Sequence, residues 1–298
     1  MLFYGKKLNS YKANCHTHTK LSDGGYTPEE VISLYREKGY DILFMTDHRK
    51  TQDVTLYTDM ASPMKVYSGI ELHPVGPRNL NWHILALGVP HPFPGEFTMG
   101  QEAVDAVNAA GGIAFVAHPY WCTFTADEVL TLKNTAGIEV YNTSTRYIGK
   151  DYNMQLWDEM LEKAPERTIN ALAVDDIHGV RDLFRGWTMI LAEENTFESI
   201  MAALKNGSFY ATQGPEIHKL SLENGIFEAE FTPSSHVHLI TCGSRGYCTC
   251  VPGMDPADPE KTITSLTFDT SKWAKGSYIR LQIRDEKGNF AWSNPVRL

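Results

Sequence analysis

The stretch ILFMTDH, residues 42–48, joins a run of four apolar residues directly to a threonine, an aspartate and a histidine. The stretch IAFVAHP, residues 113–119, repeats this arrangement with another histidine. A short continuous apolar run is typical of a strand that is buried on both faces, as in the parallel sheets of α/β proteins. Both stretches therefore predict a buried strand whose last residues carry groups suited to binding or catalysis.

Similar apolar runs recur on both sides of these stretches, and helical patterns lie between many of them. Thr27-Pro28-Glu29-Glu30 has the form of a capping box with proline at the first helical position, which predicts the start of a helix. Repeated strand–helix units indicate a parallel sheet covered by helices, either a barrel or a doubly wound sheet. The expected strands are 11–16, 42–46, 65–71, 82–87, 113–117, 137–141 and 169–175, and the further expected helices are 101–110, 151–161 and one that begins at Thr125.

The pattern changes after Gly214-Pro215. Residues 217–298 contain short alternating segments, such as 227–231, 236–241 and 278–283, separated by Gly, Pro, Asn and Asp. Such segments are typical of a small antiparallel β-sandwich. We therefore predict an α/β domain over residues 1–213 and a β-sandwich domain over residues 214–298.

The composition excludes disordered and fibrous proteins. The chain has 298 residues, of which 42% are hydrophobic and 21% charged, as in ordinary globular proteins. No stretch approaches the roughly 20 apolar residues that a membrane helix needs. Residues 1–10 contain no apolar segment of the kind found in secretory leaders, so we expect a cytoplasmic protein that does not bind membranes.

The charge balance bears on the substrate. The net charge is −9, from 27 basic and 36 acidic residues, and no basic run exceeds two residues. This disfavours nucleic acids as partners, beyond nucleotides or short oligonucleotides, because such binding depends on phosphate contacts. An anionic small substrate remains open, since bound metal ions supply positive charge locally. Five cysteines are few for a chain of this length, and an odd number cannot all pair, so we do not expect a disulfide framework.

Histidines and carboxylates gather at the ends of the expected strands. His16-Thr17-His18 would place two imidazoles on one face of a strand. The spacing alone is weak evidence, because roughly 0.4 such pairs are expected by chance at this histidine content. His236-Val237-His238 in the tail has the same spacing, and we interpret it as an ordinary strand face. The first pair differs because six histidines and three carboxylates recur at strand ends: His16, His18, Asp23, His48, Glu71, His83, His118, Asp176 and His178.

This mixture of ligand types favours a transition-metal site. Imidazole and carboxylate together suit Zn, Mn or Fe, and the absence of a paired cysteine set argues against thiolate sites. Nine candidate ligands exceed what one ion requires, so two or three divalent ions are expected. Two neighbouring ions activate water for attack on a phosphorus atom and neutralise the phosphoryl oxygens. The alternative is that these side chains are separate polar residues at strand ends.

The ordered set of motifs resembles the polymerase and histidinol phosphatase (PHP) superfamily of metal-dependent phosphoesterases, over residues 12–213. The resemblance implies a distorted seven-stranded (β/α) barrel, and the tail resembles the β-sandwich appended to some members. It also implies three ligand groups. They are His16, His18, Glu71 and Asp176 for the first ion, Asp23, His48 and His178 for the second, and a bridging Glu71 with His83 and His118 for the third. Asp23 stands where some members have histidine, so the two-ion state is better supported than the three-ion state.

The resemblance predicts a phosphoesterase that cleaves a phosphate ester of a small molecule by a hydroxide held between metal ions, with Asp23, His48 and His178 as the catalytic group. Arg146 and Arg185 are the candidate substrate-binding residues, because their loops follow ligand-bearing strands and arginine binds phosphate well. A nucleotide phosphatase or exonuclease acting on short oligonucleotides, and a non-catalytic metal-binding module, remain as alternatives.

Several neighbouring residues carry secondary interpretations. His73 and His91 compete with His83 for its place in the ligand set, and we prefer His83 because it begins a strand-like run. Asp47 is a candidate to orient the imidazole of His48. Cys248-Thr249-Cys250 is too closely spaced, with no partner cysteine or histidine cluster nearby, to predict a zinc knuckle.

Overall fold

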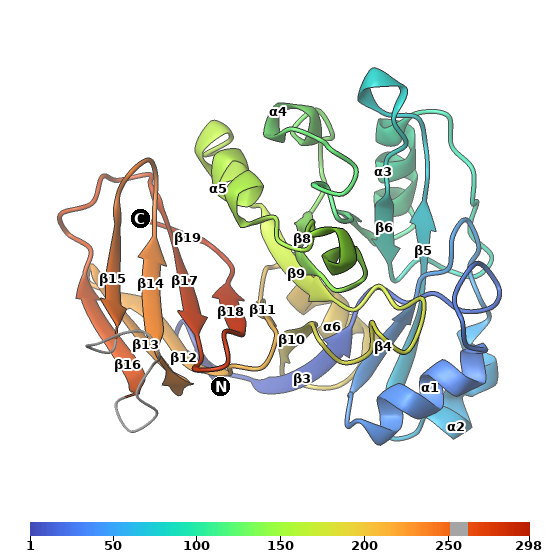
Figure 1. Ribbon diagram of the computed structural model, residues 1–298, viewed down its shortest axis with the longest axis horizontal. Coiled ribbons are helices and arrows are strands. Elements are labelled where there is room, and N and C mark those ends of the chain that lie inside the picture. Colours follow the sequence, from blue (N-terminus) through green and yellow to red (C-terminus); the bar gives the residue numbers. More distant parts are fainter. Residues whose placement is uncertain (251–261) are drawn as a thin grey trace.

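The structure is a computed structural model that describes residues 1–250 and 262–298. It confirms the α/β class: helices and parallel strands alternate through the first two thirds of the chain, and antiparallel strands follow (Figure 1). The first strands are β1 Leu2–Phe3, β2 Lys6–Lys7, β3 Asn9–Asn14, β4 Ile42–Met45, β5 Lys65–Leu72, β6 Ile84–Leu87, β7 Ile113–Val116, β8 Gly137–Asn142 and β9 Asn170–Val174.

The strands β3 to β9 lie side by side in chain order. Most pairs are parallel, but β6 is antiparallel to both β5 and β7. Our expectation of a uniformly parallel sheet is therefore wrong at this strand, because β5 and β6 follow one another as a hairpin without a crossover helix between them. An isolated parallel bridge joins Thr17, after β3, to Ile177, after β9, and so brings the two ends of the strand series together.

The helices agree with the capping pattern of the sequence. Helix α1 begins at Pro28, where Thr27 and Glu30 form both hydrogen bonds of a capping box, and α4 begins after Thr125 in the same way. Two further helices, α2 and α6, were not predicted. Among the described residues, no helix is long and apolar enough to cross a membrane. The helices are α1 Pro28–Glu37, α2 Thr58–Ala61, α3 Gly100–Ala109, α4 Ala126–Val129, α5 Met154–Lys163 and α6 Phe197–Lys205.

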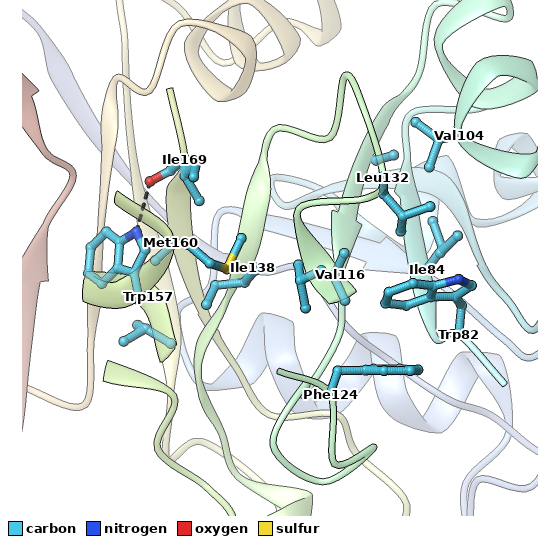
Figure 2. Packing of buried hydrophobic residues seen from close by; sticks show 14 of the residues in the cluster. Trp82, Ile84, Val104, Val116, Phe124, Leu132, Ile138, Trp157, Met160 and Ile169 are labelled. Carbon is cyan, nitrogen blue, oxygen red and sulfur yellow. Dashed lines mark hydrogen bonds between the residues drawn. The ribbon is translucent and has the colours of Figure 1, made fainter. Parts of the chain in front are cut away.

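Aliphatic and aromatic residues fill the layer between the strands and the helices α3 and α5 (Figure 2). Trp82 stacks on Phe124 with 4.1 Å between the ring centroids. Trp157 of α5 is fully buried and donates a hydrogen bond from Nε1 to the carbonyl oxygen of Ile169 at 2.8 Å. This satisfied polar contact allows a large ring to lie in the core, where it fixes α5 against the start of β9.

The later strands extend the same sheet and form a second one. The strand β10 pairs with β3, β11 pairs with β18, and the sheet continues through β17 and β14 to β15 (Figure 1). The second sheet has the order β16-β13-β12-β1-β2, so residues 2–7 pair with the tail rather than with the strand series. These strands are β10 Trp187–Ala192, β11 Phe209–Thr212, β12 Ile217–Glu223, β13 Ile226–Ser234, β14 His236–Ile240, β15 Gly246–Cys250, β16 Ile263–Asp269, β17 Tyr278–Arg284, β18 Phe290–Ser293 and β19 Val296–Arg297.

Candidate metal centre

One edge of the strand series collects all nine of the predicted ligands. His16 and His18 follow β3, His48 follows β4, and Glu71 lies near the end of β5. His83 directly precedes β6 instead of following a strand. Because β6 runs antiparallel, its beginning lies beside the end of β5, and Ile84 is in register with Leu72. His83 therefore lies at the start of its strand, as the strand-like run after it predicted, and the antiparallel course of β6 brings it to the edge where the other strands end.

Four donor atoms form a compact cage at the centre of this edge. His16 Nε2 lies 3.0 Å from His18 Nε2, 3.5 Å from Glu71 Oε2 and 3.3 Å from Asp176 Oδ1. His18 Nε2 lies 3.4 Å from the same Glu71 oxygen and 3.0 Å from the Asp176 oxygen. Ligands about 2.0–2.1 Å from a tetrahedral zinc ion would be about 3.3 Å apart. The spacing of the four atoms therefore suits one transition-metal ion.

A second group lies on the open side of the cage. Asp23 is its centre: His48 Nε2 lies 3.3 Å from one carboxylate oxygen and His178 Nε2 lies 3.4 Å from the other. His18 reaches the same group through its second ring nitrogen, 3.9 Å from Asp23. The four side chains offer ligand atoms that all lie within 4.8 Å of one another. His18 thus lies between the two groups and can serve both.

A third group surrounds the other oxygen of Glu71. His83 Nδ1 and His118 Nε2 lie 2.8 and 3.3 Å from Glu71 Oε1. The structure also brings His73 to the centre, with Nε2 at 2.7 Å from His48 Nδ1 and 3.6 Å from Glu71 Oε2. The choice between His73 and His83 was therefore unnecessary, because the hairpin of β5 and β6 places both beside Glu71.

The turn that carries Asp23 is fixed by a neighbouring carboxylate. Asp47 accepts hydrogen bonds from the backbone N–H and the hydroxyl of Thr19 and from the hydroxyl of Ser22. It forms no hydrogen bond with His48 in the described residues, so the predicted role of orienting that imidazole is wrong. Gly24 completes the turn, because a Cβ there would lie 2.5 Å from the backbone carbonyl of His18.

Glu139 is a functional residue that the sequence analysis missed. One of its carboxylate oxygens lies 2.7 Å from His16 Nδ1, and the other accepts hydrogen bonds from the His118 backbone N–H and the Asn142 side chain, both at 2.8 Å. A carboxylate on the outer nitrogen of a ligand histidine fixes the ring and its tautomer. A charged residue inside the otherwise apolar strand β8 was the only sign of this role in the sequence.

Two of the ligand positions have unusual backbone conformations. His118 has φ of 25° and Asp176 has φ of 50°, both in the left-handed region that residues other than glycine rarely adopt. Each follows directly or closely after a buried strand, β7 or β9. Such strained turns are found where tertiary structure imposes a functional geometry. Here they turn the two side chains toward Glu71 and toward His16 and His18.

The protonation of the open group follows from its contacts. Hydrogen bonds from His178 and His48 hold the pKa of Asp23 well below its usual range. Burial opposes protonation of both imidazoles, but their hydrogen bonds to Asp23 and their acidic neighbours outweigh it and raise the pKa of each to about 9. Without a cation, protons on the imidazoles therefore balance the carboxylate charge. A divalent ion would replace those protons.

The buried atoms of the cage also fit a cation. Burial opposes ionisation of Glu71 and Asp176, but the surrounding imidazoles, His16 foremost, hold the pKa of both carboxyls well below the usual range. Three buried atoms, His18 Nδ1, Glu71 Oε2 and Asp176 Oδ1, have no hydrogen-bond partner among the described residues. Each such orphaned group costs about 1–3 kcal/mol. An ion in the cage would satisfy the two carboxylate oxygens, and an ion beside Asp23 would satisfy His18 Nδ1.

A cavity of about 230 Å³ opens onto this centre. The exposed side chain of Trp121 forms part of its wall and contacts His83 and His118 edge-on, with 5.3 and 5.1 Å between the centroids. The two predicted substrate-binding arginines, Arg146 and Arg185, are not among the described lining residues. Both instead donate hydrogen bonds to the carbonyl oxygen of Arg181, outside the cavity. The lining consists of Asp23, His48, His83, His118, Trp121, Ser144, Thr145, Asp176 and His178.

Comparison with known proteins agrees with this architecture. No protein-family model matches the chain. An uncharacterized protein of Methanocaldococcus jannaschii is 24% identical over 150 residues, which cover 45% of this chain and 84% of that protein. A solved two-domain protein of Bacteroides vulgatus, containing a predicted PHP-like metal-dependent phosphoesterase, has a TM-score of 0.57 and 16% identity, over 97% of this chain and 96% of the other. The chain has the PHP fold.

A second solved structure, that of a lesion-specific endonuclease, is also similar to this chain in fold. The lesion-specific endonuclease EndoQ of Pyrococcus furiosus has a TM-score of 0.50 and 16% identity, over 66% of this chain and 56% of EndoQ. The chain thus matches little more than half of that larger enzyme. The resemblance inferred from the sequence motifs is confirmed at the level of the fold.

Proposed function

We propose that the chain is a metal-dependent phosphoesterase that hydrolyses a phosphate ester of a small molecule. The observation that carries this proposal is the convergence of nine histidines and carboxylates, from strand ends and loops spread over some 160 positions, on one centre, and six of the nine line the cavity that opens onto it. Imidazole and carboxylate ligands in adjoining groups are the donor set of phosphatases with two or more metal ions. The PHP fold supports the same reaction class.

The residues of the site would have two roles, which are to bind metal ions and to bind the substrate. His16, His18, Glu71 and Asp176 would hold one ion, Asp23, His48 and His178 a second, and Glu71, His83 and His118 a third. Bound Zn, Mn or Fe ions would supply Lewis acidity that activates water and neutralises phosphoryl oxygens. Glu139 orients the imidazole of His16 through its contact with Nδ1, the ring nitrogen that faces away from the ion. Asp23, His48 and His178, the predicted catalytic group, lie at the open side, where a phosphate group would enter.

The cavity favours a small substrate. Its volume of about 230 Å³ lies below the usual range for pockets that enclose drug-sized ligands, about 300–1,000 Å³. Trp121 covers the side formed by His83 and His118 and limits the access of water there. The cavity can hold a phosphate and a short part of its alcohol, with the remainder outside. Ser144, which lines the cavity, offers a hydroxyl group for a hydrogen bond to the ester, whereas the hydroxyl of Thr145 is engaged by the carbonyl oxygens of Asn142 and Lys150.

A nucleic acid substrate is the second candidate, and the observation that favours it is the fold shared with EndoQ. A nucleotide or the end of a short strand would fit the same cavity. The net charge of −9 opposes tight binding of a longer duplex. Arg146, Arg181 and Arg185, which meet at the carbonyl oxygen of Arg181, are the cations that we would assign to backbone phosphates.

The proposal extends to the architecture around the site. We infer that β3 to β9 form a distorted seven-stranded barrel, that residues 214–298 form a β-sandwich, and that the two domains divide near residue 213. The bridge between Thr17 and Ile177 supports closure of the barrel. The pairing of β1 with β12 ties the first residues of the chain to the sandwich.

The test is phosphate release by purified protein reloaded with Mn, Zn or Fe. We expect hydrolysis of a generic aromatic phosphate monoester, and a panel of phosphorylated metabolites then identifies the preferred alcohol. A labelled oligonucleotide in a parallel assay separates the nuclease alternative. Metal-loaded protein that hydrolyses none of these esters would contradict the proposal and favour a non-catalytic metal-binding module.

A further inference from the structure

The hairpin of β14 and β15 carries a second group of metal-ligand side chains, far along the chain from the centre described above. Register pairs His236 with Cys250 and His238 with Cys248. Directly opposed residues on antiparallel strands point to the same face, with Cβ atoms about 4.5–5.5 Å apart. Residues i and i+2 of one strand also share a face. Two imidazoles and two thiols therefore occupy one face of this hairpin.

This face is the outer one. The alternate residues Val237 and Leu239 are buried in the core between the two sheets. His236 and His238 are half-buried, and Cys248 is exposed. The sequence interpretation that no histidines lie near the cysteines is therefore wrong. The pairing of the two strands places both His-x-His and Cys-x-Cys side by side, and strand register is not visible in the spacing alone.

We propose that His236, His238, Cys248 and Cys250 bind a thiophilic transition-metal ion such as Zn²⁺. Two sulfurs and two imidazole nitrogens are a complete tetrahedral ligand set for zinc. The two imidazole rings lie nearly parallel, with 6.1 Å between centroids and 21° between planes. The thiol of Cys248 contacts that of Cys250. The four side chains are not among the groups of described residues whose donor atoms already lie within 4.8 Å of one another, so the side chains would have to rotate for an ion to bind.

The surrounding groups affect this chemistry. Arg284 of β17 is in register with His236 and therefore shares the outer face with the thiols. Burial and the neighbouring Cys250 raise the pKa of the Cys248 thiol, so the charge of the ion itself would have to favour the thiolate, which is the form that binds metals. Each cysteine would release its proton on binding, and two thiolates would neutralise the ion.

The position of the hairpin suggests what the ion would do. Among the described strands, β15 pairs with β14 alone and forms the edge of its sheet (Figure 1). An edge strand with few partners separates easily from the sheet. An ion held by two residues from each strand would join the edge strand to its neighbour. This is the role of structural zinc sites, which contribute directly to folding free energy.

The test uses cobalt, because Co²⁺ bound to thiolates gives a charge-transfer absorption in the near ultraviolet that imidazole and carboxylate ligands do not give. The full chain is reduced, stripped of metal and titrated with Co²⁺. We expect the absorption in the unaltered chain and also in the variant His16→Ala/His18→Ala, since the first centre is not its source. It should be lost in Cys248→Ser/Cys250→Ser and reduced at least about twofold in His236→Ala/His238→Ala.

Two single variants are the matched controls for the thiol changes. Cys122→Ser removes a thiol 3.6 Å from His118 in the first centre, and Cys242→Ser removes a half-buried thiol near the same sheet. Both should keep the absorption. The proposal is overturned if the unaltered chain shows no thiolate absorption, if Cys248→Ser/Cys250→Ser retains it, or if Cys122→Ser abolishes it. None of these results depends on phosphoesterase activity.

Discussion

The chain contains two His-x-His pairs with identical spacing and different surroundings. His16 and His18 are fully buried at the end of β3, and their inner nitrogens meet the carboxylates of Glu71 and Asp176. His236 and His238 lie half-exposed on β14, opposite two cysteines and beside arginines. His16 has a carboxylate on its outer nitrogen, at 2.7 Å, whereas His236 has the hydroxyl of Ser235 at 2.8 Å.

The difference shows that ligand spacing defines a possible site and the neighbouring charges define its chemistry. Buried carboxylates around the first pair demand a cation with open coordination positions, as hydrolysis requires. Thiols around the second pair would complete a closed tetrahedral set, which has no position left for substrate. The first pair therefore belongs to the proposed catalytic centre and the second to a proposed structural site.

The largest expected effect is the loss of the first pair. The variant His16→Ala/His18→Ala should lower kcat/KM for the best phosphate ester by at least about 10³-fold, since it removes two ligands of the central cage and the transition-state stabilisation of the ion. Bound metal, measured by elemental analysis, should fall in parallel. The matched control is His218→Ala, at an exposed position on β12. Full activity and full metal content in the double variant would contradict the assignment of His16 and His18 to the catalytic metal centre.

Loss of the carboxylate behind His16 should have the next largest effect. The variant Glu139→Gln keeps the size of the side chain and removes its charge, so we expect metal affinity to fall about 10–100-fold, as for other carboxylate partners of ligand histidines. A competition titration with a chromophoric chelator measures this affinity. Glu37→Gln, at the exposed end of α1, is the control. Equal affinity for Glu139→Gln and the unaltered chain would show that the carboxylate does not support His16.

In the metal-free chain, the histidines of the two regions should contribute to folding stability with opposite dependence on pH. The pKa values of His48 and His178 are raised to about 9. Their contribution to stability is therefore fully present below the unfolded-state pKa of about 6.5 and is lost as the pH rises through 9. The pKa of His238 is lowered, so its contribution is present above about 6.5 and is lost as the pH falls through its folded-state pKa.

Histidine NMR titration of the metal-free protein checks these directions residue by residue. Each resonance is assigned by the corresponding alanine variant. A pKa for His48 and His178 at or below that of His238 would contradict the contrast in charge between the two regions.

The smallest expected effect is at the arginines outside the cavity. The charge reversal Arg185→Glu should raise KM for a small ester by about two- to fivefold with little change in kcat. The reason is that Arg185 contacts Arg181 rather than the ligand cluster, and exposed charges act weakly through water and salt. The effect should shrink as ionic strength rises. An unchanged KM at low salt would remove Arg185 from the substrate-binding residues, and Arg146→Glu provides the parallel test.

Much of the first centre was visible in the sequence because strand ends are a strong constraint. Apolar runs such as 42–45 and 113–116 fix the strands, and the polar residues that follow must lie at one edge. Register and direction are not encoded locally. For this reason the antiparallel course of β6, the contribution of His73 and the pairing of His238 with Cys248 emerged only in three dimensions. Glu139 escaped notice because it lies within a strand instead of at its end.

The most direct test of the account is anomalous X-ray scattering from crystals of protein reloaded with zinc or manganese. We predict a strong peak between His16 Nε2, His18 Nε2 and the carboxylates of Glu71 and Asp176, and a second beside Asp23, His48 and His178. Crystals of fully reloaded protein with no anomalous peak among these side chains would contradict the claim that they form a metal centre.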